Sequence, residues 1–156
     1  MMASCCKIFP AVLAIAAGVA MATPARAALG GGGASVLTDA AALGGSVNVT
    51  LLQQYDIHEI TNADGMRVRE FLNRAGVVFA LSWSGPVVPD LRQLLGASFS
   101  AYAKAEAALA RPGMQRSVRV ALPDLVVELD GHLRAYRGRA YLPASIPAGT
   151  STADLR

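Results

Sequence analysis

Apolar and polar residues alternate along two neighbouring segments in the middle of the chain, residues 55–60 and 66–72. Alternation with a period of two is typical of a half-buried β-strand. The turn signals NADG at 62–65 and NRAG at 73–76 follow these segments. Residues 77–83 are apolar on both parities, like a covered central strand. The pattern therefore predicts three antiparallel strands joined by tight turns, which is a meander.

Two short helices are predicted after this meander. Pro89 and Asp90 favour a helix start, since proline suits the first helical position and an acid suits the positive N-terminal end. The leucines at 91, 94 and 95 would form the apolar side of this helix, and Gly96 would end it. A second helix is predicted to begin at Ser98 and to end before the Pro-Gly pair at 112–113.

Strand patterns return in the last part of the chain. Residues 118–122 and 125–129 are two short candidate strands, and Asp130-Gly131 is a two-residue hairpin signal before a third strand over 133–141. The order of elements predicts an α+β fold: an antiparallel three-strand meander, two short helices and then a C-terminal β-hairpin. We expect a single small domain over 54–142, with an irregular tail over 143–156.

Residues 1–27 are predicted to be a cleavable signal peptide. Lys7 supplies the positive charge, residues 8–22 form an apolar run, and a small-residue A-x-A site places cleavage between Ala27 and Ala28. An uncleaved anchor is the alternative, although a membrane-spanning helix needs about 20 apolar residues. We therefore expect a periplasmic or secreted protein without a membrane span after signal cleavage.

Residues 28–53 are rich in glycine and alanine and carry only a weak pattern. The four glycines of 30–33 indicate a flexible spacer, because they lack the spacing of a phosphate-binding loop. We expect a short helix near 38–43 and otherwise mobile chain.

Charge and cysteine content exclude some classes of function. Of the 14 Lys and Arg residues, Lys7 and Arg26 lie in the leader, which leaves 12 against 11 Asp and Glu. So small an excess predicts no nucleic-acid binding. Both cysteines, Cys5 and Cys6, also lie in the leader, so the rest of the chain has no disulfide, thiol nucleophile or zinc–thiolate site.

Pairing Thr61 with Met66 and Leu72 with Val77 predicts the two faces of the meander. Glu70 falls on the core face, in a row with Tyr55, Ile57, Met66, Val68, Leu72, Val77, Phe79, Leu81 and Trp83. The other face would carry the polar residues Asp56, His58, Arg67, Arg69 and Ser82, with the apolar residues Ile60, Phe71, Val78 and Ala80 among them. A carboxyl group in an apolar row must be paired, or its pKa rises, and such acids collect at catalytic sites. We expect the first case, a structural Glu70 held ionised by a cation or by backbone N–H groups.

The other candidate site residues each have a structural alternative. His58 and His132 are weak catalytic candidates beside Glu70. Arg67 and Arg69 would bind an anion together with Asp56 and His58, or would belong to an ordinary solvated face. Trp83 would line a ligand groove, or would pack in the core near Met66 and the helix at 91–95. Arg134, Arg137 and Arg139 would face an acidic partner, or would be ordinary edge-strand charges. No metal-ligand set and no cofactor motif is present.

Several distinct short motifs follow one another along the chain at a specific spacing. They are HE at 58–59, VREF at 68–71, GVVFA at 76–80, WSGP at 83–86, PDL at 89–91, LLG at 94–96, GHLRAY at 131–136 and GRA at 138–140. In these motifs the chain resembles a proteobacterial family of exported proteins, domain of unknown function 2844, over about residues 28–149. The resemblance implies export and the limits of the domain, and it implies no activity.

Two functional hypotheses follow. The first is a non-enzymatic binding or assembly module of the cell envelope or the secreted fraction, whose partner is an envelope protein or a small ligand. The alternative is a small hydrolase or isomerase that uses Glu70 with His58 or His132. A pocket holding Glu70 beside a histidine would favour the enzyme, whereas an apolar patch or an open sheet edge would favour the binding module.

Overall fold

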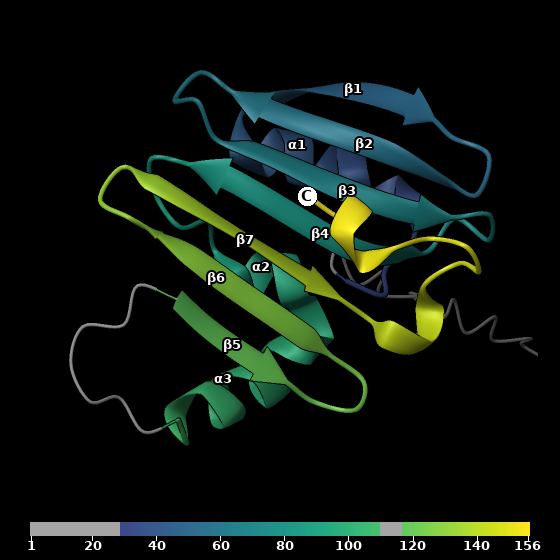
Figure 1. The fold of residues 1–156 in the computed structure, drawn as a ribbon. Helices are drawn as coiled ribbons and strands as arrows, with labels where there is room; N and C mark the ends of the chain where they lie inside the picture. The colour runs from purple at the N-terminus through teal and green to yellow at the C-terminus, as the bar shows by residue number, and fades with distance from the viewer. Residues whose placement is uncertain (1–28, 110–116) are drawn as a thin grey trace, which may run out of the picture.

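A computed structural model describes residues 29–109 and 117–156, which form one seven-stranded antiparallel sheet (Figure 1). The strand order is β1-β2-β3-β4-β7-β6-β5. The strands are β1 (Gly45–Leu51), β2 (Tyr55–Asn62), β3 (Arg67–Asn73), β4 (Val78–Gly85), β5 (Ser117–Ala121), β6 (Val126–His132) and β7 (Ala135–Tyr141). The helices are α1 (Val36–Leu43), α2 (Leu91–Leu95) and α3 (Phe99–Ala107), and four short 3₁₀ turns complete the fold.

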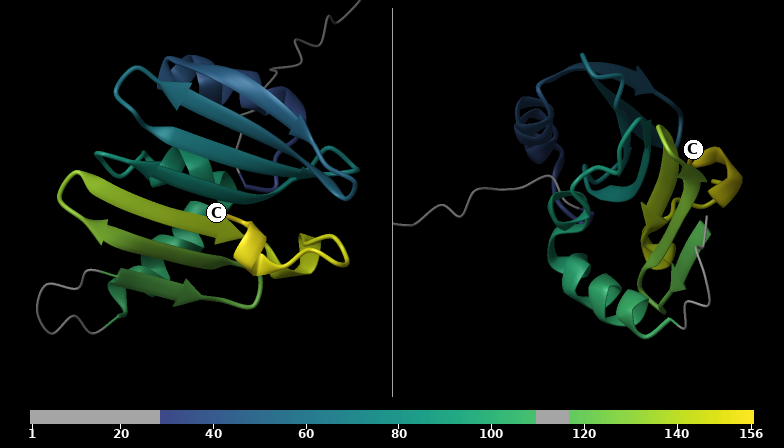
Figure 2. Two further views of the ribbon diagram at one scale, coloured as in Figure 1. Left: turned by 45° about the horizontal axis from the view of Figure 1, so that its top comes forward. Right: turned by 90° about the vertical axis from the view of Figure 1, so that its left-hand side faces the viewer.

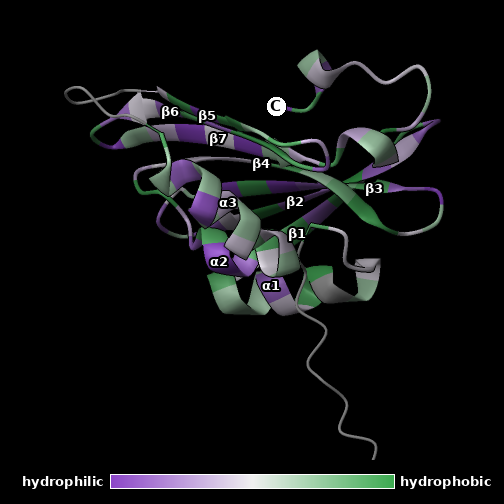
Figure 3. Ribbon diagram, turned by 90° about the horizontal axis from the view of Figure 1, so that it is seen from below, coloured by the Kyte–Doolittle hydropathy of each residue, from purple (hydrophilic) through white to green (hydrophobic). Residues whose placement is uncertain are grey.

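The sheet has helices on one face and the C-terminal segment on the other (Figures 2 and 3). We call the helix-covered side the inner face and the opposite side the outer face. The main core lies on the inner face and includes Trp83 and the α2 leucines. A second, aromatic core on the outer face joins Phe71, Phe79 and Tyr141 to Leu155 of the C-terminal segment. Both faces of the central strands are therefore buried.

The predicted α+β class with antiparallel pairing is confirmed, but the sheet is larger than a three-strand meander and a hairpin. The meander has a fourth strand, β1, and β4 pairs with β7, so that all the strands form one sheet. β1 lies in the segment expected to be mobile. Its alternation is VNVTL, which the surrounding glycines and alanines obscure.

The four glycines at 30–33 are bonded into the fold rather than forming a spacer. Gly30 N–H donates to the carbonyl of Val78 at 2.8 Å, and Gly33 N–H donates to that of Gly76 at 2.8 Å. A Cβ on Gly33 would lie 2.8 Å from Leu72 Cδ2, so glycine lets this backbone approach β3 closely. The same segment is anchored by Leu29, which is buried and donates its N–H to the carbonyl of Leu94.

The first predicted helix is confirmed as α2. The side chain of Asp90 accepts hydrogen bonds from the N–H groups of Arg92 and Gln93, and Gly96 ends the helix with φ of 50°. The second helix, α3, begins after Ser98 as predicted, although the Ser98 side chain makes no capping hydrogen bond. The predicted end of that helix at 112–113 lies outside the described residues.

The first hairpin is shifted by one residue from the predicted pairing. Thr61 pairs with Arg67, so His58 lies opposite Glu70. A one-residue shift exchanges the two faces of a strand. His58 and Ile60 therefore share the inner face with Glu70, while Tyr55, Ile57 and Glu59 share the outer face with Phe71.

A β-bulge between β3 and β4 places two further residues, Val78 and Phe79, on other faces of the sheet than predicted. Phe71 pairs with Ala80 and Leu72 with Val78, so that Phe79 is the extra residue. Val78 consequently belongs to the inner core, and Phe79 to the outer aromatic core. The predicted faces of both were reversed, because the sequence signal for a bulge is weak.

The C-terminal hairpin turns later than the Asp130-Gly131 signal predicts. His132 pairs with Ala135, so Leu133 and Arg134 form the turn, and Arg134 adopts a positive φ of 66°. Asp130 and Gly131 continue β6 instead. This register places Glu128 opposite Arg139 and Asp130 opposite Arg137, pairs of opposite charge that favour it.

Candidate functional site

Two rows of polar side chains cross the outer face of the sheet, one residue per strand. The first row runs through Glu59, Arg69, Ser82, Arg139, Glu128 and Arg119. The second runs through Thr61, Arg67, Ser84, Arg137, Asp130 and Ser117. In both rows a serine of β4 stands between an arginine of β3 and an arginine of β7. Directly paired residues project from the same face, so the Arg–Ser–Arg sets converge on β4.

Glutamates hold the arginines of the first row. Arg69 Nε donates to Glu59 Oε2 at 2.6 Å, and Arg139 Nε donates to Glu128 Oε2 at 2.7 Å. Ser82 between them is buried. In the second row, Arg67 Nε lies 3.5 Å from Glu59 Oε1, and the side chain of Arg67 remains half exposed. Arg137 is exposed and has no salt bridge within 29–109 and 117–156.

A hollow of about 720 Å³ lies over these rows, within the size range of small-molecule sites. Ser82, Ser84 and Gly138 border it on the strands, and its sides are formed by the turn at 64–65 and by Arg134 with the start of β7. Six arginines line it, namely Arg67, Arg69, Arg134, Arg137, Arg139 and Arg156, against three acids, Asp64, Glu128 and Asp130. Even with Glu59 counted among the acids, arginines exceed acids by six to four. The lining of the hollow therefore has an excess of arginine side chains over acidic side chains.

The C-terminal segment forms one wall of this hollow. Leu155 is fully buried in the outer aromatic core. Arg69 Nη1 donates to the main-chain oxygen of Arg156 at 2.6 Å, and Arg139 Nη1 donates to the carbonyl of Thr152. The predicted irregular tail is thus a docked element, and the first-row arginines are already engaged with main-chain oxygens. The second-row arginines, Arg67 and Arg137, therefore have more N–H groups left to donate to a ligand.

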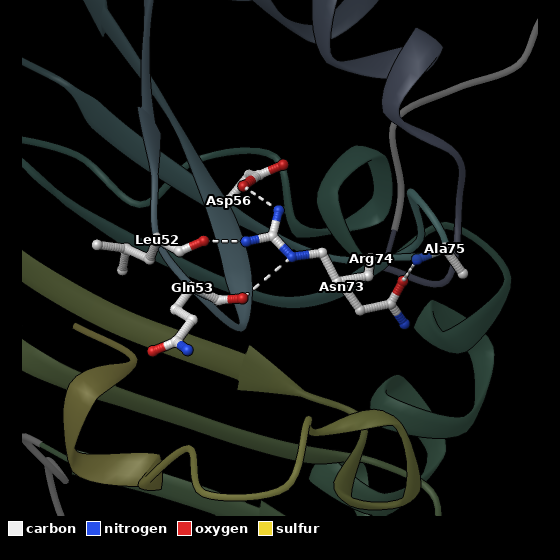
Figure 4. A network of polar contacts seen from close by, with 6 residues as sticks. All are labelled: Leu52, Gln53, Asp56, Asn73, Arg74 and Ala75. Atoms are coloured by element: carbon white, nitrogen blue, oxygen red, sulfur yellow. Dashed lines mark hydrogen bonds and ion pairs between the residues drawn. The ribbon is translucent and has the colours of Figure 1, made fainter.

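The predicted polar cluster of Asp56, His58, Arg67 and Arg69 does not form. The one-residue shift leaves both arginines on the outer face and places His58 on the inner face, opposite Glu70. Asp56 instead accepts a hydrogen bond from Arg74 Nη1 at 3.0 Å (Figure 4). Arg74 also donates to the carbonyls of Leu52 and Gln53, so it fixes the β1–β2 loop.

Glu70 lies on the apolar side of the sheet as predicted, but the described residues supply no cationic or N–H partner for it. It is fully buried, and neither carboxyl oxygen accepts a hydrogen bond from a donor among the described residues. Its neighbour is Asp39 of α1, which is also buried and accepts a hydrogen bond from Gln93 Nε2 at 2.9 Å. Burial, the charge of Asp39 and a hydrogen bond to Asp39 raise the pKa of Glu70 from 4.5 to about 8.

Trp83 is a core residue, as the structural alternative predicted. Its ring packs on the inner face with Met66, Leu94 and Leu95, and it is 3% exposed. Gly138 lies opposite it on β7, and a Cβ there would be 2.3 Å from Trp83 Cζ2. Trp83 is also among the residues that line the hollow, although it is nearly fully buried and belongs to the inner core.

The structure also shows where the remaining candidate residues lie, on β7 and in the β6–β7 hairpin. β7 is a central strand, so the interpretation of Arg137 and Arg139 as edge-strand charges is wrong. Arg134 lies in the β6–β7 turn and lines the hollow, whereas His132, at the end of β6, does not. Residues 29–109 and 117–156 contain no group of three or more His, Cys, Asp and Glu side chains placed to hold a metal ion. In the same ranges, no helix has the length and apolar character that crossing a membrane requires.

Comparison with known proteins gives a family but no characterised relative. No curated protein and no solved structure matches the chain. One family model matches residues 25–155, which covers nearly the entire chain. That match agrees with the resemblance found in the motifs, and the chain belongs to DUF2844, a family of proteins of unknown function.

Proposed function

We propose that this chain is an exported, non-enzymatic binding protein whose ligand carries a carboxylate or phosphate group held in the outer-face hollow. The observation that carries the proposal is the second Arg–Ser–Arg row. Arg67 and Arg137 flank Ser84 in an arginine-rich hollow and both are exposed. A guanidinium presents a planar fork of donors that matches carboxylate and phosphate oxygens in bidentate geometry.

The spacing of this row suits one anionic group. Neighbouring strands lie about 4.8 Å apart, so the Cα atoms of Arg67 and Arg137 are separated by about 10 Å. Long side chains reaching inward from both sides would enclose a single carboxylate or phosphate, and the Ser84 hydroxyl would donate from below. The first row supports this arrangement, since Glu59 and Glu128 fix Arg69 and Arg139 in place.

Binding is favoured over acid–base catalysis by the position of the ionisable residues. Glu70 and His58 lie on the inner face, on the other side of the sheet from the hollow, and Glu70 is fully buried. His132 does not line the hollow. Glu70 and the two histidines line neither the hollow nor the smaller pocket near Val118 and Leu129. The hydrolase or isomerase alternative would need Glu70 to reach a substrate, and the full burial of Glu70 disfavours this.

Export is supported by the leader and by the way the fold begins. The A-x-A site ends at Ala27, and Leu29 is already buried in the core with its N–H bonded to Leu94. Cleavage before Ala28 would remove the leader without removing any residue that packs in the domain. The binding site would then face the periplasm or the medium.

Isothermal titration calorimetry of the purified protein with inorganic phosphate and with malonate tests the proposal. We expect saturable binding of at least one of these anions and no binding of the neutral sugar glucose. Arg137→Gln should weaken binding by roughly 10- to 100-fold, because a hydrogen bond to a charged group contributes about 1.5–3 kcal/mol.

Arg92→Gln is the matched control for that substitution. Arg92 lies in α2, on the other side of the sheet, where its guanidinium stacks over Phe99 at 4.7 Å. The control makes the same change in charge and should leave the affinity unchanged. Equal losses in the two variants would mean that net charge alone drives binding, and the proposal would fail.

A further inference from the structure

The edge strand β1 has the features of a pairing surface. No described strand lies beyond it, and β2 is its one partner among the described residues. Among the strands that the structure describes, none pairs with the main-chain N–H and C=O groups of β1 that point away from β2. Natural edge strands are usually protected by charged side chains, proline, a bulge or short length. β1 has seven residues, GSVNVTL, with no charge and no proline.

The sequence of β1 is complementary to itself in antiparallel pairing. If Asn48 lies opposite its own copy across a two-fold axis, Val47 pairs with Val49 and Ser46 pairs with Thr50. Every pair then matches in polarity within 46–50. A strand that pairs with its own copy brings identical residues close together near the axis. A charged residue near Asn48 would therefore lie beside an equal charge of the other copy and be repelled, but β1 has no charged residue.

The side chains of β1 supply an uncovered apolar row on the inner face. Val47 packs against the main core, and Val49 and Leu51 share its parity. Val49 is 47% exposed and Leu51 73% exposed. α1 has only eight residues and leaves this end of the strand open. Pairing across the edge would bring these exposed apolar side chains of both copies together and bury part of their surface.

Neighbouring elements also hold β1 in a fixed position within the monomer. Arg74 fastens the loop after β1 through Asp56 and the carbonyls of Leu52 and Gln53 (Figure 4). α1 packs on β1 and β2 at its other side. The opposite edge of the sheet differs, because β5 has five residues and carries Arg119. A strand fixed in this way loses little conformational freedom on pairing.

We propose that β1 pairs antiparallel with β1 of a second copy about Asn48, which joins two sheets into one across a two-fold axis. The anion-binding hollow lies over β3, β4 and β7, away from this edge, so both hollows remain open in the dimer. The inference is independent of the proposed function, since it rests on a different surface.

Sedimentation equilibrium of the purified protein, over concentrations up to the near-millimolar range, tests this dimer. We expect a reversible monomer–dimer equilibrium. Asn48→Lys places two ammonium groups at the axis and should raise the dissociation constant at least about tenfold. Asn48 is exposed and lies opposite Glu59, so the variant should still fold. Gln53→Lys, an equal charge on an exposed residue just beyond the strand, should dimerise like the parent.

A charge-exchange experiment checks the register itself. Asn48→Asp should also fail to dimerise alone, whereas an equimolar mixture of Asn48→Lys and Asn48→Asp should form a heterodimer. A parent that stays monomeric at every concentration would overturn the proposal, even if β1 accepted a strand from another protein. A dimer that survives Asn48→Lys unchanged would place the interface elsewhere and would overturn it as well.

Discussion

The carboxyl groups of Asp39 in α1 and Glu70 in β3 lie together in the interior, and both residues are almost completely buried. Two neighbouring carboxyl groups cannot both ionise in the protein interior without a large cost in free energy. The stable arrangement is therefore one proton shared between them. The pKa of Glu70 accordingly rises to about 8. Gln93 donates to Asp39 from α2, and His58 lies opposite Glu70 on β2. A proton held between these two carboxyl groups would fasten α1 to the sheet.

Stability should therefore fall as the pH rises. Glu70 holds a proton in the folded state up to about pH 8 but loses it near pH 4.5 when unfolded. Between these values the folded state binds more protons, so the free energy of unfolding decreases by up to about 1.4 kcal/mol per pH unit. Urea unfolding between pH 5 and pH 9 measures this slope.

Glu70→Gln should remove most of that slope. An amide keeps the shape and donates to Asp39 at any pH, so the variant should equal the parent near pH 5 and exceed it near pH 8. This outcome is the reverse of the one expected for a cation-paired glutamate. A Gln variant that is less stable than the parent at pH 8 would show that a cation or N–H group holds Glu70 after all.

Gly138 is required because the Trp83 ring covers it. Gly138→Ala should destabilise the protein by roughly 1–3 kcal/mol, since the new methyl group would lie 2.3 Å from the indole. Gly32→Ala is the control, because a Cβ at Gly32 would meet nothing within 4 Å. Thermal unfolding of both variants measures the difference. Equal effects would mean that the indole does not cover Gly138.

The C-terminal segment should contribute to stability although it has little regular structure. Leu155→Ala should cost about 2–5 kcal/mol, because it empties a site between the aromatic rings of the outer core. Leu133→Ala, at a turn position that is 81% exposed, should be nearly neutral. Denaturant unfolding compares the two, and a neutral Leu155→Ala would show that the segment is not docked in solution.

The exported form of the protein should begin at Ala28. Cleavage there keeps Leu29, whose burial and hydrogen bond to Leu94 tie the segment to the core. Intact-mass spectrometry of the protein recovered from the exporting cell gives the answer directly. A mass that retains Met1 would contradict the predicted processing.

Much of the fold was predictable because local signals were strong. The Asp90 cap and Gly96 fixed α2, and the burial of Trp83 and Glu70 followed from their parity. The hairpin register was not predictable from turn signals alone. Around Gly65 and Gly131, pairing of side chains across the strands decides the alignment, and those partners are distant in sequence.

The candidate site was predictable only in its residue types. Arg67, Arg69, Arg137 and Arg139 were candidates, but nothing local shows that β4 brings the two pairs together around Ser84. That arrangement depends on the β4–β7 pairing, which closes over about fifty residues of chain. Asp39 was missed for the same reason: a single acid in an alanine-rich helix shows nothing of its distant neighbour.

The most direct test of the anion site observes the arginines themselves. In a ¹H–¹⁵N NMR titration of the side-chain Nε–H groups with inorganic phosphate and malonate, Arg67 and Arg137 should shift saturably with one dissociation constant. Arg92, on the inner-face helix α2, should not move. Absence of saturable shifts at Arg67 and Arg137 with either anion, or equal shifts at Arg92, would contradict the proposed binding function.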